Sequence, residues 1–185
     1  LHAGKHVFVE KPLCLTEEEL QDIRSTYEKQ AAEGLHLMVG FNRRFSPHAK
    51  EARTFFSSRS NPLVMLYRIN AGRIPADHWV QDPDVGGGRV IGEVCHFVDY
   101  MHALCASPPT SVFASRVGRH SSGITEDQCS LSLTFGDGSI GTIIYTAEGN
   151  SALQKEHFEA HADGMSLVMS DFMETRTYHN GKSAL

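Results

Sequence analysis

The second half of the chain alternates short apolar stretches with glycine-containing turns, and this pattern restricts the fold more than any other feature. Gly136-Asp137-Gly138 and Ala162-Asp163-Gly164 each join two such stretches, as the tight turns of β-hairpins do. Consecutive hairpins build an antiparallel sheet. Strands are predicted over residues 63–69, 112–117, 128–135, 139–146, 157–162, 165–169 and 175–179.

Two helices are predicted to pack on one side of this sheet. The first begins at Ser46-Pro47, because proline suits the first helical position, and ends before Asn61-Pro62. The second covers residues 89–105 and is stopped by Ser107-Pro108-Pro109. The sequence therefore predicts an α+β domain over residues 46–185, with a mostly antiparallel, open-faced sheet and helices on one side.

The start of the chain follows a different pattern, in which a helix separates two strands. His6-Val7-Phe8-Val9 and residues 35–41 are short apolar stretches, and a capping box at Thr16 begins the helix between them. A connection of this length joins parallel strands, so residues 1–45 are expected to be the last βαβ unit of an α/β domain. The residues before Gly4 read as the end of a helix, so we expect the chain to be a piece of a longer protein.

The composition excludes several classes of protein. Hydrophobic residues make up 41% and charged residues 21%, as in globular domains. There is no apolar run long enough for a membrane span and no secretory signal at the start. A formal net charge of −5 and a pI of about 6.1 argue against a nucleic-acid partner. The cysteines form no CxxC pair and suggest free thiols in a reducing, cytoplasmic compartment: Cys14, Cys95, Cys105 and Cys129.

Two polar motifs follow the predicted parallel strands. Ligands of open parallel sheets bind beyond the carboxyl ends of the strands, where Glu10-Lys11-Pro12 and Asn42-Arg43-Arg44 are expected. Lys11 can hydrogen-bond a substrate hydroxyl there, and can move a proton if burial lowers its pKa. Arginine suits an anionic or oxygen-rich ligand. A surface lysine in a turn and solvated arginines beside a helix cap are the alternatives.

The predicted helix over residues 89–105 carries a third motif. Glu93, His96, Asp99 and His102 recur every three residues and share one slowly drifting face. A histidine flanked by carboxylates can act as a general acid or base, but a metal ligand or a structural hydrogen bond would give the same pattern. Gly86-Gly87-Gly88 precedes the helix without forming a dinucleotide fingerprint. No HExxH is present, and no metal site is predicted.

In order and spacing, these motifs resemble the glucose–fructose oxidoreductase/inositol dehydrogenase (Gfo/Idh/MocA) family over nearly the whole chain. The resemblance implies that residues 1–45 are the end of a Rossmann domain and that residues 46–185 form a substrate-binding and oligomerisation domain. It implies hydride transfer between NAD or NADP and a hydroxyl carbon of a sugar, cyclitol or related polyol. It also implies a homodimer or homotetramer formed through the open sheet face.

The resemblance also implies residue roles. Lys11 matches the family lysine beside the nicotinamide and the reacting hydroxyl, and His96 matches the catalytic acid/base. The family's Lys–Pro bond is commonly cis, so a cis bond is expected between Lys11 and Pro12. The positions implied to bind substrate are Asn42, Arg43, Glu93 and Asp99. The positions implied to contact the cofactor are Glu10, Lys11, Pro12 and Trp79.

The chain departs from the family pattern in two ways. The family usually has an aspartate four residues before the histidine, but here Gly92 is at that position and Glu93 follows it. A one-residue shift turns a helical side chain by about 100°. The family's glycine-rich fingerprint would precede residue 1, so this chain alone is expected to bind NAD weakly and to be inactive. Two alternatives are a non-catalytic sugar-binding or oligomerisation module of the same family, and a metal-dependent lyase or isomerase using the Glu93, His96, Asp99 and His102 face.

Overall fold

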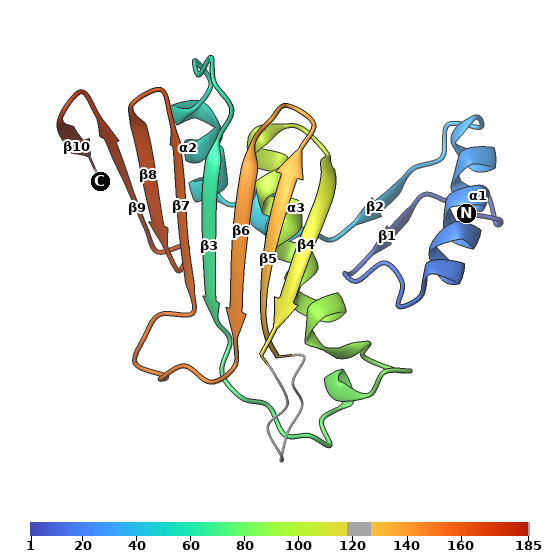
Figure 1. The fold of residues 1–185 in the computed structure, drawn as a ribbon. Helices are drawn as coiled ribbons and strands as arrows, with labels where there is room; N and C mark the ends of the chain where they lie inside the picture. Colours follow the sequence, from blue (N-terminus) through green and yellow to red (C-terminus); the bar gives the residue numbers. More distant parts are fainter. Residues whose placement is uncertain (118–126, 185) are drawn as a thin grey trace. The chain divides into compact units, whose positions relative to one another are not determined.

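The computed structural model of the chain describes residues 1–117 and 127–184 (Figure 1). These residues form two compact units. The first contains Leu1–Asn42 and Asp77–Cys95, and the second contains Arg43–Ala76 and the described part of His96–Leu185. No helix in these residues is long and apolar enough to cross a membrane.

The first unit contains a βαβ motif made of β1 (Val7–Val9), α1 (Glu17–Ala31) and β2 (Leu37–Val39). The two strands are parallel, with Val7 opposite Leu37, so the predicted βαβ pairing is confirmed. The predicted capping box is also present. The Glu19 amide donates to Thr16 Oγ1 at 3.2 Å, and the Thr16 amide donates back to Glu19 Oε2 at 3.2 Å. The bond between Lys11 and Pro12 is cis, as expected.

The second segment of this unit contains a tight turn and a widened helix. The short 3-10 helix η2 (Trp79–Gln81) leads into the glycine triplet, where Gly87 and Gly88 have positive φ angles. A π-helical turn, η3 (Val90–Val94), follows and continues as α3 (Cys95–Cys105). The sequence predicted one regular helix over residues 89–105. The first turn of this helix is instead π-helical, a form common at functional sites.

Two glycines of this segment, Gly86 and Gly92, should respond in opposite ways to replacement by alanine. A Cβ at Gly86 would lie 2.4 Å from Val80 Cα, whereas a Cβ at Gly92 would meet only Gly86 O, at 3.5 Å. We expect Gly86→Ala to lower the free energy of unfolding by about 1–3 kcal/mol, because backbone atoms must move. Gly92→Ala should be neutral or stabilising by up to about 1 kcal/mol, because alanine favours a helix. Denaturant titration of both variants measures the difference, and equal losses would contradict the observed packing at Gly86.

The second unit is built on an eight-stranded sheet with the order β10-β9-β8-β7-β3-β6-β5-β4 (Figure 1). Its strands are β3 (Val64–Asn70), β4 (Pro109–Arg116), β5 (Gln128–Phe135), β6 (Ile140–Thr146), β7 (Glu156–Ala162), β8 (Met165–Ser170), β9 (Glu174–His179) and β10 (Lys182–Ala184). Every neighbouring pair is antiparallel except β3 and β6, so the mostly antiparallel sheet is confirmed.

Two strand predictions need correction. The sequence did not predict β10, which is short and polar. Strand β4 begins at Pro109, earlier than the predicted 112, although Pro109 was expected only to stop a helix. Proline is tolerated there because β4 is an edge strand and Pro109 is its first residue.

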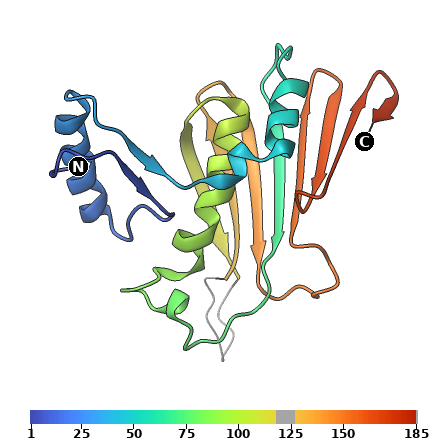
Figure 2. The same ribbon diagram turned by 180° about the vertical axis from the view of Figure 1, so that it is seen from behind.

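Helices α2 (Pro47–Phe55) and α3 cover one face of this sheet (Figure 2), and no described helix of the second unit covers the other face (Figure 1). The predicted start of α2 at Ser46-Pro47 is confirmed, and Ser46 Oγ caps the helix by accepting from the Ala49 amide. Between helices and sheet lies an aromatic core centred on Tyr67. The ring of Tyr67 lies 4.8 Å from that of Phe97 and 5.2 Å from that of Phe158, and all three side chains are fully buried. The open-faced sheet with helices on one side is therefore confirmed.

Candidate active site

The loop after β1 holds Lys11 against the π-helical turn η3. Lys11 Nζ donates a hydrogen bond to the Gly92 carbonyl oxygen at 2.7 Å. The neighbouring Glu10 approaches the end of β2, because a Cβ at Gly40 would lie only 3.0 Å from Glu10 Oε2. The first unit therefore brings together the carboxyl ends of its parallel strands, the place where ligands bind in open parallel sheets.

Trp79 and Glu93 belong to the same unit and differ in exposure. The Trp79 side chain is 62% exposed at the start of η2, so its ring is available to a ligand. Glu93 is held from within its own helix, because Arg89 Nη2 lies 3.0 Å from Glu93 Oε2. Arg89 is buried, so this ion pair fixes the carboxylate beside the π-helical turn.

The two arginines after β2 belong to the second unit and pair with carboxylates of the same unit. They lie on the 3-10 helix η1 (Asn42–Phe45), which the sequence did not predict. Arg43 binds Glu156 through both ends of its fork, with Nε to Oε2 at 3.1 Å and Nη2 to Oε1 at 2.5 Å. Arg44 binds both carboxylate oxygens of Asp99 in the same way. The alternative that these arginines are solvated groups beside a helix cap is therefore wrong, because both guanidinium groups are paired with carboxylates.

The Arg43–Glu156 pair sits inside the aromatic core. Glu156 Oε2 also accepts a hydrogen bond of 2.6 Å from the Tyr67 hydroxyl, and the Arg43 guanidinium lies 5.0 Å from the centre of the Phe97 ring. Burial, followed by the charge and hydrogen bond of Glu156, raises the pKa of Tyr67 far above its usual range. Tyr67 is therefore a neutral donor that helps to hold a buried carboxylate.

Sequence reasoning missed Glu156 as a functional residue. The inward-facing positions of β7 are Glu156, Phe158 and Ala160, and all three are buried. A carboxylate in an inward-facing row of apolar residues is the signal that could have found it, because buried charges need a partner.

His96 and Asp99 lie on the first turns of α3, and both are buried. His96 directly follows the π-helical turn, one residue before Phe97. Asp99 is the partner of Arg44, so its carboxylate is already engaged by a guanidinium. Two of the four residues of the Glu93, His96, Asp99 and His102 face are thus carboxylates bound to arginines. The described residues contain no group of three or more potential ligands that could hold a metal ion.

A cavity of about 610 Å³ lies at the carboxyl ends of the parallel strands β3 and β6. Asn70, the last residue of β3, is buried there and donates from Nδ2 to the carbonyl oxygens of Asn150 at 2.8 Å and Leu153 at 3.1 Å. Arg73, Lys155 and other polar residues also line the cavity. Asn70 is not among the predicted site residues, although an asparagine that ends an apolar strand is a detectable signal.

The four cysteines are all free thiols. Burial raises the pKa of the Cys105 and Cys129 thiols, and burial together with the Glu19 charge raises that of Cys14. These three thiols are therefore protonated and weakly nucleophilic at neutral pH.

Comparison with known proteins identifies the class to which this fold belongs. Residues 62–167, more than half of the chain, match the GFO/IDH/MocA C-terminal domain. The oxidoreductase YrbE of Bacillus subtilis is 28% identical over 145 residues, which cover 76% of this chain and 41% of that protein. Inositol 2-dehydrogenase of Rhizobium meliloti is 30% identical over 152 residues, 82% of this chain and 42% of that protein.

A solved structure shares the fold. Levoglucosan dehydrogenase in complex with NADH and levoglucosan superposes with a TM-score of 0.78 at 22% identity, covering 99% of this chain and 53% of that one. The chain belongs to the Gfo/Idh/MocA family and contains its C-terminal domain. It spans about two fifths of the length of these two curated relatives.

Proposed function

We propose that the chain is the C-terminal portion of an NAD(P)-dependent oxidoreductase that moves a hydride between the nicotinamide and a hydroxyl carbon of a sugar, cyclitol or related polyol. The observation that carries this proposal is the hydrogen bond from Lys11 Nζ to the Gly92 carbonyl. This bond holds the Lys11 ammonium group against η3, the turn that precedes His96 in the sequence. The chain is also a member of a family of oxidoreductases. The NADH and levoglucosan bound by levoglucosan dehydrogenase support the cofactor and substrate classes.

The described residues fit one end of the cofactor. Glu10, Lys11 and Pro12 lie at a parallel strand end, and the exposed ring of Trp79 can pack on a nicotinamide. The described residues include no glycine-rich turn between a strand and a helix that could hold a pyrophosphate. When bound, the cofactor supplies the hydride acceptor. The rest of its site is assigned to sequence upstream of this chain.

The proposed chemistry divides two tasks between two side chains. Lys11 donates a hydrogen bond to the reacting hydroxyl and orients it. His96 accepts the hydroxyl proton as the hydride leaves the same carbon, so the carbinol becomes a carbonyl. Asn42 and Arg43 are proposed to line the substrate side. Because Arg43 is paired with Glu156, it would act by shaping the site rather than by neutralising an anion.

Glu93 or Asp99 is proposed to orient the His96 imidazole. Each carboxylate already has an arginine partner, Arg89 for Glu93 and Arg44 for Asp99. A carboxylate fixed by an arginine keeps one orientation, as an orienting group must. We place neither residue in direct contact with the reacting carbon.

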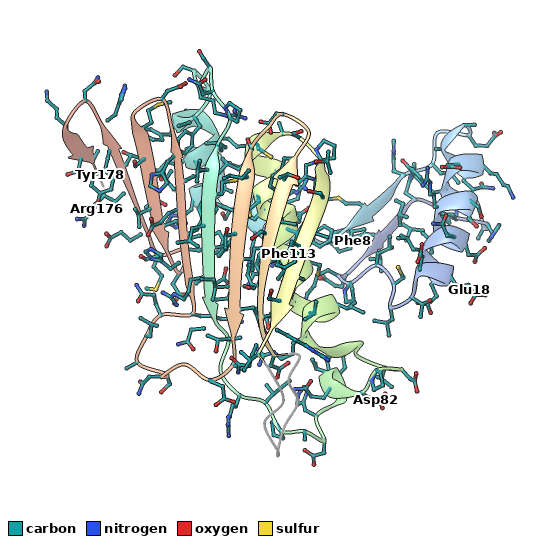
Figure 3. All side chains as sticks on the ribbon, in the orientation of Figure 1. Phe8, Glu18, Asp82, Phe113, Arg176 and Tyr178 are labelled. Atoms are coloured by element: carbon teal, nitrogen blue, oxygen red, sulfur yellow. The ribbon has the colours of Figure 1, made fainter. Side chains whose placement is uncertain are left out.

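The uncovered surface of the βαβ motif supports a larger dinucleotide-binding domain around residues 1–45. Phe8 is 62% exposed on β1 and Met38 is 46% exposed on β2 (Figure 3 labels Phe8), while α1 has no buried residue. Further strands and helices of a Rossmann-type domain would cover this apolar surface. The free cysteines support a reducing, cytoplasmic compartment.

The open face of the eight-stranded sheet is proposed to form a homodimer or homotetramer interface. Phe113, on β4, is 73% exposed (Figure 3), and Val64 and Ile144 are 51% and 43% exposed. Exposed apolar side chains gathered on one sheet face mark a surface for association. A second candidate function, a non-catalytic sugar-binding or oligomerisation module, is favoured by Gly92, which offers Lys11 only a backbone carbonyl.

The test of the proposed function uses the chain extended upstream by its own sequence. Reduction of NAD or NADP is followed with a panel of free sugars, inositols and other polyols. Turnover of at least one compound supports the oxidoreductase. Tight NADH binding with no turnover across the panel would favour the non-catalytic module.

A further inference from the structure

The open face of the sheet carries a row of titratable side chains on β7 that the proposed chemistry does not use. His157, Glu159 and His161 alternate along the strand and point away from Phe158, which packs in the core beneath the helices. His157 Nε2 lies 2.8 Å from Glu159 Oε1, and His161 Nε2 lies 3.6 Å from Glu159 Oε2. One carboxylate therefore bridges two imidazoles on the face proposed for self-association.

The neighbouring strands add few charges to this row. On β3 the residues opposite His157, Glu159 and His161 are Arg68, Leu66 and Val64, and on β8 they are Ser170, Val168 and Ser166. Beyond β8, the Arg176 and Glu174 side chains of β9 pair with each other at 2.9 Å. Figure 3 shows Arg176 and Tyr178 at this side of the sheet.

The charges of this face balance while the histidines are neutral. Two arginines, Arg68 and Arg176, match two glutamates, Glu159 and Glu174. A net-neutral face with exposed apolar side chains favours a second copy of itself over a strongly cationic or anionic partner. In a twofold interface both copies present the same patch, so the two rows come to the same interface.

We propose that the His157–Glu159–His161 row makes association of two copies through this face dependent on pH. The dimer holds at neutral and mildly alkaline pH and opens as the histidines gain protons. This inference rests on the proposed assembly. Histidine is the side chain that changes charge between about pH 8 and pH 5. Each face then gains two positive charges, and the two facing copies repel.

The glutamate keeps its charge through this range. The hydrogen bond from His157 lowers the pKa of Glu159, although partial burial opposes the shift. The carboxylate therefore stays ionised over this range, and its charge is already balanced by the arginines of the same face, so the charges gained by the histidines are not offset. Dimer dissociation is consequently linked to proton uptake, so lowering the pH favours the monomer.

Sedimentation velocity of the chain at about pH 8 and about pH 6 tests the proposal, with near-ultraviolet circular dichroism to show that the fold is kept at both values. We expect the dimer dissociation constant to rise at least about tenfold at the lower pH. A variant with both His157→Gln and His161→Gln should keep the same constant at both values. The matched control is His179→Gln on β9, next to Tyr178 and on the opposite face of its strand, which should leave the pH dependence intact.

The outcomes separate the two ideas. If the dimer is equally tight at both pH values, or if the double variant keeps the pH dependence, the proposed role of the His157–Glu159–His161 row is wrong. The proposed dimer itself is not contradicted by either result. A chain that is monomeric at the higher pH at all accessible concentrations overturns the assembly, and the pH dependence with it. A dimer that loosens at low pH in the unmodified chain and in His179→Gln, but not in the double variant, supports both.

Discussion

Replacing Glu156 by glutamine should lower the free energy of unfolding of this chain by about 3–5 kcal/mol, the usual cost of breaking a buried ion pair by removing one partner. Glutamine keeps the shape of the side chain but removes its charge. The side chains of Arg43 and Glu156 are only 17% and 6% exposed, so water cannot replace the lost carboxylate. Denaturant unfolding of the variant and the unmodified chain measures the loss.

Two controls separate the buried charge from other effects. Glu174→Gln removes the partner of Arg176 in a pair whose side chains are 51% and 48% exposed, and should change stability by less than about 1 kcal/mol. Tyr67→Phe removes only the hydroxyl that donates to Glu156, and should cost about 0.5–1.5 kcal/mol. A loss for Glu156→Gln no larger than that for Glu174→Gln would contradict the assigned role of the pair.

Replacing His96 by alanine should lower kcat by about 10²–10⁴-fold in the active protein formed by the chain and its upstream sequence, if His96 is the acid/base. Affinity for NADH should stay within a few fold, because the proposed role concerns the proton of the substrate. The change of kcat with pH that comes from protonation of the catalytic base should disappear in this variant. Steady-state kinetics over a range of pH measures both effects.

His96 is buried, so a loss of activity alone does not prove a catalytic role. His96→Gln keeps more of the side-chain volume and should be as inactive while retaining more stability, as thermal unfolding would show. His102→Ala, six residues further along the same helix, should leave kcat unchanged in an oxidoreductase. A metal-dependent lyase using the whole face would lose activity in both variants. Unchanged kcat in His96→Ala would remove His96 from the acid/base role.

The local features of the fold were predictable from the sequence because short-range chemistry decides them. The capping box at Thr16, the cap at Ser46 and the hairpin turn at Ala162-Asp163-Gly164 each depend on a few adjacent residues. The parallel βαβ pairing followed from the length of the connection between β1 and β2. The π-helical turn escaped prediction because its residue types do not differ from those of a regular helix.

The sheet order and the ion pairs could not be read from the sequence in the same way. Strands β3 and β6 lie side by side in parallel although about 70 residues separate them, so their pairing is decided by packing across the whole sheet. The same holds for Arg43 and Glu156, which are 113 positions apart. The arginine is predictable at a strand end, and the inward-facing position of Glu156 marks a carboxylate that needs a partner, but nothing local to either residue pairs the two.

In the proposed function, this chain carries the substrate and assembly part of a dinucleotide-dependent enzyme, and the remaining cofactor site is assigned upstream. An NADH fluorescence titration, run side by side on this chain and on the chain extended upstream by its own sequence, tests it most directly. The account predicts saturable binding at micromolar NADH, in the range typical of enzyme ligands, only by the extended chain. Equally tight binding by the 185-residue chain, or no binding by either, would contradict it.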